Sequence, residues 1–563
     1  MPLLNHIQST PREALNWRLF ATIFLIGLAG LGRGTDEGLI GSLTASKAWL
    51  TEFNVDDKSS AQSNVVSMVQ LGNIPGALFA FFAVDRLGRL NTIRLCSLLW
   101  ILGIAIWITS AGSLGQTYGG RFVAGIGIGG FSVVCPTYLS EISPRTIRGL
   151  AVTVFSAMVY LGITLSYFAN LGSQSGFPKL SARVWRVPVS LNFVYAGLLF
   201  LGTFLVKESP RSLVKRGKTN EALNTLSWYR NMPSDHPYLR DEFNAILEES
   251  QREAQAMEGH TYATVFKHLF ARSANLYRLI VIGFGIQILG QWSGGGSLTI
   301  YAQKIFELVG VKTNASLYTT GIFGIVKLVS GLCCAFFLID LLGRKRSVFI
   351  GIGLQTLAAL YLAIFLSTVD PNEDAAQSAG QQRASIAAIV MIFVSGVGWA
   401  LGFNTIQYLI GTEIWPMELR AMASSLIMCV HFANQYGSSR AIQPMLAALD
   451  RWGLFAFWTC IGVLAAIYIF VFIPETSGRS LESMDELFEQ RWWKIGMASK
   501  KPISGDLEGN GREKVPEEVA RAQQQLPALG NNEAIDGHTT GKDKGMQEKG
   551  GAGFTSLSTR DAA

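Results

Sequence analysis

Twelve long apolar stretches follow one another along this chain of 563 residues, and no other feature limits its fold as strongly. They lie near residues 19–41, 64–84, 91–110, 117–138, 150–171, 187–206, 277–301, 318–339, 347–367, 385–410, 422–443 and 454–473. Each approaches the roughly 20 residues that an α-helix needs to cross a bilayer. Only 15% of the residues are charged, against about 25% in an average soluble domain. One apolar segment can be an anchor, but twelve predict an all-α protein that crosses the membrane repeatedly.

The net charge of +7 follows the predicted topology. Lysine and arginine crowd alternate loops: Arg86, Arg89 and Arg94; Arg145 and Arg148; Lys207 to Lys218; and Arg344 to Arg346. Cytoplasmic loops carry this excess, so we expect both termini and the central loop in the cytoplasm. The surplus needs no nucleic-acid partner. On the outer side, Asn314-Ala315-Ser316 makes Asn314 a glycosylation candidate in a loop, although such tripeptides also arise by chance.

Changes in composition divide the chain into five parts. Residues 1–18 are polar and contain no cleavable targeting peptide. Six apolar segments fill residues 19–206 and six fill residues 277–473. Residues 207–276 between them are charged, with spacing that permits cytoplasmic helices. Residues 474–563 form a polar cytoplasmic tail that we expect to be largely disordered.

The two halves repeat each other. Three motifs recur in the same order at a separation of about 260 residues: Asp85 to Arg89 as Asp340 to Arg344, Glu141 and Arg148 as Glu413 and Arg420, and Glu208 as Glu475. Such a duplication predicts two six-helix bundles with a cavity between them near the middle of the bilayer. Alternating access is the motion that duplicated halves can perform.

The repeated motifs place charges at the predicted inner ends of the helices. They comprise Asp85, Arg89, Glu141, Arg148, Glu208, Arg211, Asp340, Arg344, Glu413, Arg420 and Glu475. We expect ion pairs between the bundles that break when the cytoplasmic side opens. One exposed pair contributes at most about 1 kcal/mol, so only a cluster can latch the two bundles together. The alternative is that these charges solvate the loop ends.

The motifs resemble those of a known family. The run from Gly120-Arg121 to Gly129, the segment from Glu141 to Arg148, Glu208-Ser209-Pro210-Arg211 and Pro474-Glu475-Thr476 resemble the sugar-porter branch of the major facilitator superfamily. Within that branch the chain resembles fungal hexose, quinate and galacturonate permeases, over about residues 19 to 490. The resemblance implies the major facilitator fold, a location in the plasma membrane, and a sugar or sugar-acid substrate.

Enzymatic chemistry is not expected. Gly125, Gly127 and Gly130 match a dinucleotide-binding pattern, but they lie inside an apolar helix, where Gly125 and Gly129 instead permit close helix packing. The histidines lack the paired spacing of a metal site. Without a nucleophile and its base, a nucleotide loop or a metal cluster, we expect no cofactor, no metal and no catalysis.

Two charges inside the apolar segments concern energy coupling. Burying Asp36 in the first segment or Arg121 in the fourth costs about 3 kcal/mol or more unless they are paired. The resemblance implies that Asp36 accepts the transported proton and that Arg121 tunes its affinity. The alternative is a fixed salt bridge in a facilitator. Glu37 lies about 100° round the helix from Asp36, and we place it near the external entrance.

Sugar recognition needs amides, hydroxyls and aromatic surface. The segments that would line the cavity supply Gln287, Gln291, Trp292, Lys327, Asn404, Gln407, Tyr408, His431 and Gln435 as expected substrate contacts. Gln287 and Gln291, four residues apart, share one helix face, although such side chains also bond helix to helix in membranes. For His431 we favour hydrogen bonding over proton relay. Gly290, Gly296 and Ser156 depart from the family pattern, which argues against an ordinary glucose site.

Lys327 bears on the choice of substrate. Many members of the resembling family carry asparagine here, whereas quinate-type permeases and related sugar-acid carriers often carry lysine. A cation that faces the cavity suits a carboxylate; the alternatives are a protein carboxylate as partner, or a side chain that extends to the interface. The favoured function is proton symport of a sugar, polyol or sugar acid of the galacturonate or quinate type. A proton-independent facilitator and a nutrient sensor that signals through its tail are the alternatives.

Overall fold

The computed structural model describes residues 11–56, 60–144, 146–257, 262–334, 343–371, 378–404, 407, 414–415, 417–475, 487–488 and 495–496. Within these ranges every regular element is a helix, which confirms the all-α prediction. The N-terminal half contains η1 (Arg12–Ala14), α2 (Trp17–Thr44), α3 (Lys47–Phe53), α4 (Ser60–Leu87), α5 (Arg89–Ile108), α6 (Leu114–Ile142), α7 (Arg148–Gly176) and α8 (Arg183–Gly202).

The described parts of the central segment and of the second half are also built from helices. The central segment forms α9 (Pro210–Lys215), α10 (Thr219–Arg230), α11 (Pro237–Met257) and α12 (Tyr262–Ala271). The second half contains α13 (Ser273–Leu276), the π-helical segment η2 (Tyr277–Phe284), α14 (Gly285–Trp292), α15 (Gly295–Ile300), α16 (Ala302–Leu308), α17 (Thr313–Cys333), α19 (Arg344–Thr368), α20 (Ala379–Leu401), α22 (Met417–Ala448) and α23 (Asp450–Phe472).

Eleven helical stretches in the described ranges are long and apolar enough to cross a membrane. In lipid a spanning segment must satisfy its own backbone hydrogen bonds, and a helix does so. The expected segment near 422–443 lies within α22, which has 32 residues but a more polar sequence. His431, Gln435 and Ser439 on this helix are buried against other helices. With α22, the helices are consistent with the predicted twelve-helix arrangement.

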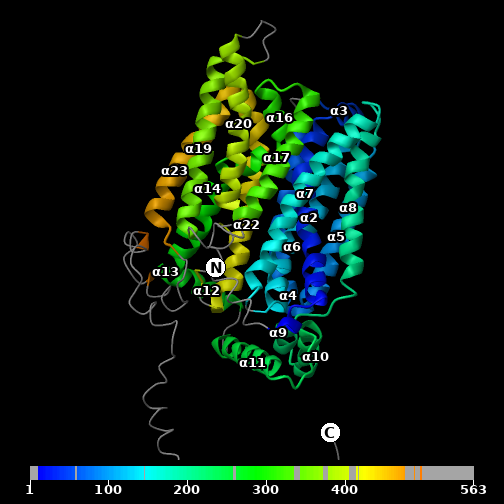
Figure 1. Ribbon diagram of the computed structural model, residues 1–563, viewed down its shortest axis with the longest axis vertical. Coiled ribbons are helices and arrows are strands. Elements are labelled where there is room, and N and C mark those ends of the chain that lie inside the picture. The colour runs from blue at the N-terminus through cyan, green and yellow to red at the C-terminus, as the bar shows by residue number, and fades with distance from the viewer. Residues whose placement is uncertain are drawn as a thin grey trace, which may run out of the picture. The chain divides into compact units, whose positions relative to one another are not determined.

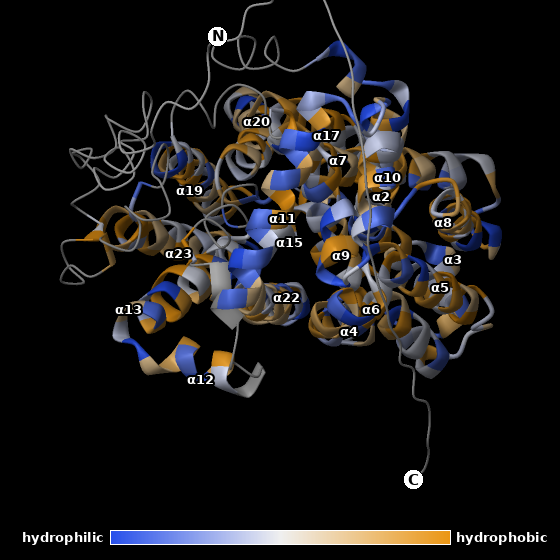
Figure 2. Ribbon diagram, turned by 90° about the horizontal axis from the view of Figure 1, so that it is seen from below, coloured by the Kyte–Doolittle hydropathy of each residue, from blue (hydrophilic) through white to orange (hydrophobic). Residues whose placement is uncertain are grey.

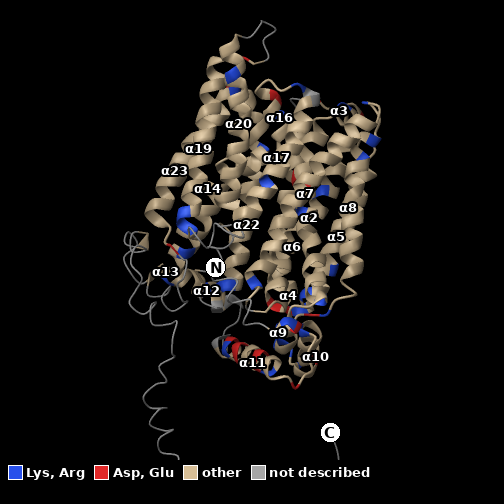
Figure 3. Cartoon of the chain, viewed as in Figure 1, with Lys and Arg blue, Asp and Glu red and all other residues tan. Residues whose placement is uncertain are grey.

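Figure 1 shows α9, α10 and α11 grouped at one end of the spanning helices and α3 and α16 at the opposite end. We call these ends the linker side and the far side. Lysine, arginine and acidic residues gather in α9–α11 and at helix ends, and they are sparse along the spanning helices (Figure 3). Seen from the linker side, the spanning helices are largely hydrophobic and α11 is largely hydrophilic (Figure 2).

Within each half the helices pack in pairs. In the first half α2 runs along α7, and both α4 and α5 run along α6; in the second, α19 packs against α20 and α23. The predicted close packing at Gly125 and Gly129 is confirmed. A β-carbon at either position would lie 2.3 Å from a backbone oxygen of α4, that of Val69 or that of Asn73.

A small core fastens α9–α11 to the first half. Arg230 is fully buried and donates to Glu242 through Nε at 2.8 Å and Nη2 at 2.6 Å. Its Nη1 donates to the backbone oxygen of Ile142, at the end of α6, at 2.9 Å. Burial raises the pKa of Tyr229, so its hydroxyl stays protonated and donates to the backbone oxygen of Lys207 at 2.6 Å. The linker helices are therefore bonded to the N-terminal half.

The two halves meet where α4 packs against α22, where α7 packs against α17, and where α2 packs against α15 and α16. Towards the far side, Arg440 Nη1 donates to Ser63 Oγ at 2.9 Å and Gln443 lies 3.4 Å from Gln62. A β-carbon at Gly41 would lie 1.8 Å from the Ile300 backbone oxygen, so α2 and α15 touch through their backbones. The halves are thus in direct contact on the far side.

Candidate functional site

Asp36 and Arg121, the pair expected to serve proton coupling, are in contact. Nη1 of Arg121 donates to Oδ1 of Asp36 at 2.9 Å, and Nη2 donates to Oδ2 at 3.3 Å. The side chain of Arg121 is 0% exposed and that of Asp36 is 11% exposed. Nε of Arg121 also donates to the Val65 backbone oxygen at 2.6 Å, and its guanidinium lies 4.7 Å from the Trp107 ring centroid. α2 and α6 therefore hold a two-bonded ion pair that water barely reaches.

A second charge pair, on the same helix, was not recognised from the sequence. Arg33 Nε lies 3.3 Å from Glu37 Oε1, one helical turn away. Glu37 also accepts from Gln435 Nε2 at 3.2 Å, and Arg33 Nη2 lies 3.4 Å from His431 Nε2. Gln435 and His431 belong to α22, so two residues on one face of α2 contact two residues on one face of α22. Glu37 therefore contacts the other half of the protein within a buried polar network.

His431 continues this network to the glutamine pair of α14. Its Nδ1 lies 2.8 Å from Gln287 Oε1 and 3.2 Å from Gln291 Nε2. A guanidinium can only donate, so His431 Nε2 accepts from Arg33, and the proton of a neutral ring lies on Nδ1 and is donated to Gln287. Trp292 Nε1 donates to Asn434 Oδ1 at 3.1 Å. Three expected substrate residues thus meet at one place and join α14 to α2.

A helix break lies beside several buried acceptors that have no partner among the described residues. α14 ends at Trp292 and α15 begins at Gly295, with Gly294 between them at φ 92°, a backbone conformation that favours glycine. The side-chain oxygens of Gln291, Gln355, Gln407 and Gln435 and the Ser297 hydroxyl are buried without a hydrogen-bond partner among the described residues.

These acceptors can bind a ligand that carries donors. Gln407 and Gln291 lie next to Gly290 and Gly296, positions without side chains. A buried carbonyl oxygen without a donor costs about 1–3 kcal/mol, which the hydroxyls of a bound polyol would recover. Of the remaining expected contacts, Asn404 is half-buried and Tyr408 lies outside the described residues.

Lys327 lies between the halves and is 1% exposed. Its Nζ donates to the hydroxyl of Thr299 and lies 5.6 Å from the ring centroids of both Tyr160 and Phe323. Thr299 in turn accepts through its backbone oxygen from Tyr167 of α7 at 2.5 Å. The described residues place no carboxylate within ion-pair distance of Lys327, and its burial leaves no path for its ammonium group to the interface.

The central charges do not balance. Arg33 with Glu37 and Asp36 with Arg121 form two ion pairs, and Lys327 is an additional buried basic group that Glu37 attracts from beyond ion-pair distance. An isolated buried charge is costly unless a partner offsets it. A ligand with one negative charge would therefore neutralise this region.

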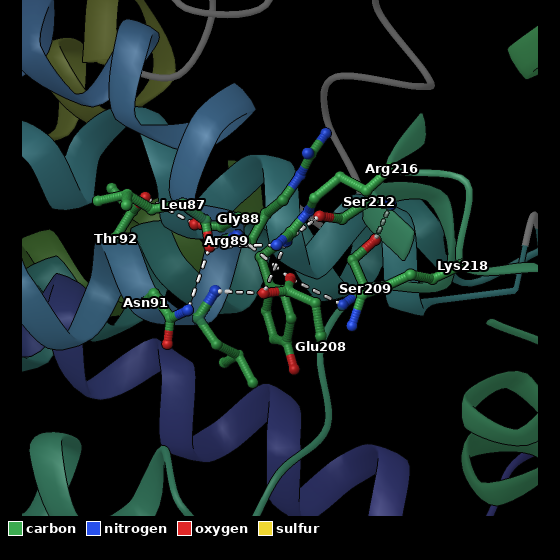
Figure 4. Close-up of polar contacts among 12 residues, drawn as sticks. Leu87, Gly88, Arg89, Asn91, Thr92, Glu208, Ser209, Ser212, Arg216 and Lys218 are labelled. Carbon is green, nitrogen blue, oxygen red and sulfur yellow. Dashed lines mark hydrogen bonds and ion pairs between the residues drawn. The ribbon is translucent and has the colours of Figure 1, made fainter. Parts of the chain in front are cut away.

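Two of the predicted gate carboxylates cap helices. Glu208 accepts from the backbone nitrogens of Arg89 and Leu90, both at 3.1 Å, at the start of α5 (Figure 4). Glu475 accepts from the backbone nitrogens of Arg344 at 2.9 Å and Lys345 at 3.1 Å, at the start of α19. A carboxylate at a helix N-terminus satisfies free N–H groups and the helix dipole. The repeated motif therefore performs the same structural task in both halves.

Other charges of the gate set contact their own half or the linker. Arg89 Nη2 lies 2.7 Å from Glu141 Oε1, Glu141 also accepts from the Ser209 hydroxyl, and Arg211 Nη1 lies 2.7 Å from Glu249 Oε1. Arg420 donates to the Trp415 backbone oxygen at 3.2 Å. These contacts join elements within one half or its linker. The expected pairs between the bundles are not among these contacts.

Several further predicted residues are placed only in part. A small hollow on the linker side is lined by Glu141, Ser143, Arg148, Arg211, Glu242, Ala245 and Ile246. Asp85 lies near the end of α4. Asp340 and Glu413 lie outside the described residues. Asn314 was expected in a loop, but its backbone lies in the first turn of α17, and its side chain is outside the described part of the chain.

Comparisons with known proteins show what the chain is similar to. A family model described as "Sugar (and other) transporter" matches residues 22–488. A quinate permease of Emericella nidulans is 30% identical over 487 residues, covering 86% of this chain and 90% of that protein. A probable quinate permease of Aspergillus flavus is 30% identical over 508 residues, covering 89% and 94%.

Solved structures share the fold. The proton:xylose symporter XylE of the major facilitator superfamily, bound to 6-bromo-6-deoxy-D-glucose, superposes with a TM-score of 0.69 at 22% identity, covering 84% of this chain and 99% of that chain. An inward-open structure of the xylose transporter XylE from E. coli gives 0.67 at 21% identity, covering 83% and 99%.

Proposed function

The chain belongs to the sugar (and other) transporter family of the major facilitator superfamily, and we propose that it imports a sugar-derived acid together with a proton. As a member of this family it is a multi-pass membrane transporter and not an enzyme. The observation that carries the proposal is Lys327, a buried cation that lies between the two halves and has no carboxylate partner in the described part of the chain.

The substrate we favour has one carboxylate and several hydroxyls. Its carboxylate binds Lys327 and its hydroxyls donate to the buried oxygens of Gln291, Gln407 and Gln435, which lack partners in the described structure. The names of the relatives, quinate permeases, support a carboxylated polyol. Galacturonate has the same combination of groups. A neutral sugar would donate hydrogen bonds to these oxygens but would bring no negative charge to Lys327.

Proton coupling is assigned to Asp36 and Arg121. When Asp36 binds a proton, its charged contact with Arg121 is lost, so protonation weakens the bond between α2 and α6. A singly charged acid that moves with one proton carries no net charge across the membrane. The likeness to a proton:xylose symporter supports this assignment.

The contacts of α2 with α22 provide the link between substrate and conformation. We name Arg33, Glu37, His431 and Gln435 the inter-half clasp. A substrate that binds Gln287 competes for the bond this side chain makes with His431, and His431 contacts Arg33. Binding therefore changes the clasp, and a ligand shifts a conformational equilibrium only through such differential contacts.

In the proposed topology the protein spans the plasma membrane and its linker side faces the cytoplasm. Residues 1–18 and 474–563 are then cytoplasmic, 19–206 and 277–473 form the two bundles, and 207–276 form the linker. The contacts at Ser63 and Arg440 then close the external side. The gate residues on the linker side hold each half together while the halves move as units.

Uptake into transporter-deficient yeast tests the proposal. Radiolabelled quinate, galacturonate, glucose and xylose are offered at acidic pH with and without a protonophore. Uptake of the acids that the protonophore abolishes is expected. Uptake of neutral sugars that ignores the protonophore would replace the proposal with a facilitator, and an absence of uptake from correctly inserted protein would favour the sensor.

A further inference from the structure

Helix α12 (Tyr262–Ala271) precedes the spanning stretch Ser273–Ile300 and contributes no residue to the linker core. In the view from the linker side it lies at the edge of the helices, next to α13 (Figure 2). It packs against α13 and α22. Two of its side chains, Val265 and Leu269, are 5% and 0% exposed within the core of the second half.

The remaining surface of α12 has two different flanks. At about 100° per residue, Phe266 and Phe270 form one flank beside the buried residues. They are 47% and 42% exposed, and their rings contact each other at 4.9 Å between centroids. On the other side of the buried face lie His268 and Arg272, while Lys267 borders the phenylalanines; all three are exposed. The helix thus has a protein face, an aromatic flank and a polar flank.

This division is typical of a helix that lies along a membrane surface. Such a helix buries apolar side chains at the boundary between headgroups and acyl chains and keeps its cations among the headgroups. The spanning stretch that follows exposes Ile280 and Ile288, at 46% and 43%, to the surroundings of the helices. Both the aromatic flank of α12 and this stretch therefore present exposed apolar side chains that suit contact with lipid.

We propose that α12 is an interfacial helix that docks on the bilayer leaflet of the linker side and prefers anionic phospholipids. Phe266 and Phe270 enter the acyl boundary, and Lys267 and Arg272 contact phosphate and carboxylate groups of the lipids. Basic residues near a membrane surface attract anionic lipids. Docking in this way fixes the depth at which the seventh spanning helix enters the membrane, whatever the transported substrate is.

Photo-crosslinking in the full-length protein tests this placement. Benzoylphenylalanine, which is close to phenylalanine in shape, is introduced at position 270, and separately at position 266 in case one variant folds poorly. The matched control carries it at position 268, on the polar flank of the same helix. Each protein is reconstituted into phosphatidylcholine vesicles with and without phosphatidylserine, irradiated, and analysed by mass spectrometry.

Phospholipid adducts at 266 and 270, several-fold more abundant than at 268, are expected. In mixed vesicles phosphatidylserine should be enriched among the adducts roughly fivefold over its share, and Lys267→Glu with Arg272→Glu should remove that enrichment. Equal adducts on both flanks, no lipid adducts at 266 and 270, or crosslinks from the aromatic flank to another part of the chain would overturn the proposal.

Discussion

Replacing Lys327 with methionine separates a substrate-binding cation from a structural one. Methionine keeps an unbranched side chain of similar length but removes the ammonium group and its bond to the Thr299 hydroxyl. The surroundings stay apolar, because Tyr160 and Phe323 flank the site. The change therefore removes charge with little change in packing.

The expected effects on transport and stability have opposite signs. Removing one partner of a buried, hydrogen-bonded charge pair costs about 2–5 kcal/mol, which corresponds to a rise of roughly 30- to 5000-fold in the KM for an acid substrate. A neutral sugar should change by less than about threefold, which is under 1 kcal/mol. Lys327 is 1% exposed without a carboxylate partner in the described structure, so its replacement by an apolar residue should leave the midpoint of thermal unfolding unchanged or raise it.

The assay is initial uptake of labelled quinate and glucose into liposomes over a range of concentrations, together with thermal unfolding in detergent. Lys312→Met is the matched control, because Lys312 precedes the same helix, α17, and is exposed. An equal loss for acid and neutral substrates, or a lower unfolding midpoint with unchanged quinate KM, would refute the role we give to Lys327.

Three further changes address coupling, the clasp and the linker. Asp36→Asn should retain exchange of labelled for unlabelled substrate but lose accumulation driven by a proton gradient; dependence of both on the gradient would contradict this. Glu37→Gln removes one clasp charge and weakens the hydrogen bond from Gln435; since such a bond contributes about 1 kcal/mol, a cysteine introduced at Gln62 should react several-fold faster with an impermeant thiol reagent, and an unchanged rate would argue against the clasp. Arg230→Met leaves a partly buried carboxylate without its partner and should destabilise the protein by about 3–5 kcal/mol, measured by thermal unfolding, whereas Arg240→Met at an exposed pair should change stability by under about 0.5 kcal/mol.

The fold could be predicted from the sequence because lipid allows few solutions. Hydrophobic length identifies spanning helices, since each must satisfy its own backbone hydrogen bonds. Gly125 and Gly129 likewise predict contact, because only small residues allow backbones to approach closely in a membrane. Among the spanning helices, the hydrophobic signal in the sequence is weakest for α22, because its buried face is polar where it meets other helices.

The site was predicted less completely, for reasons that particular residues illustrate. Arg33 and Glu37 could have been recognised as opposite charges one turn apart in an apolar segment. Their partners on α22 could not, because Arg33 and His431 are 398 positions apart in the chain. Spacing also does not tell whether a carboxylate such as Glu208 accepts from a side chain or from the backbone of a helix start.

The paired caps at Glu208 and Glu475 decide where the chain can be divided. Glu208 ties the beginning of the linker to α5, and Arg230 ties α10 to α6, so the chain as far as α11 travels with the first half. Glu475 ties the chain beyond α23 back to α19, and α12 packs on the second half. Two polypeptides made by a cut between α11 and α12 would each keep their own tethers, so the protein is suited to expression as two complementing fragments.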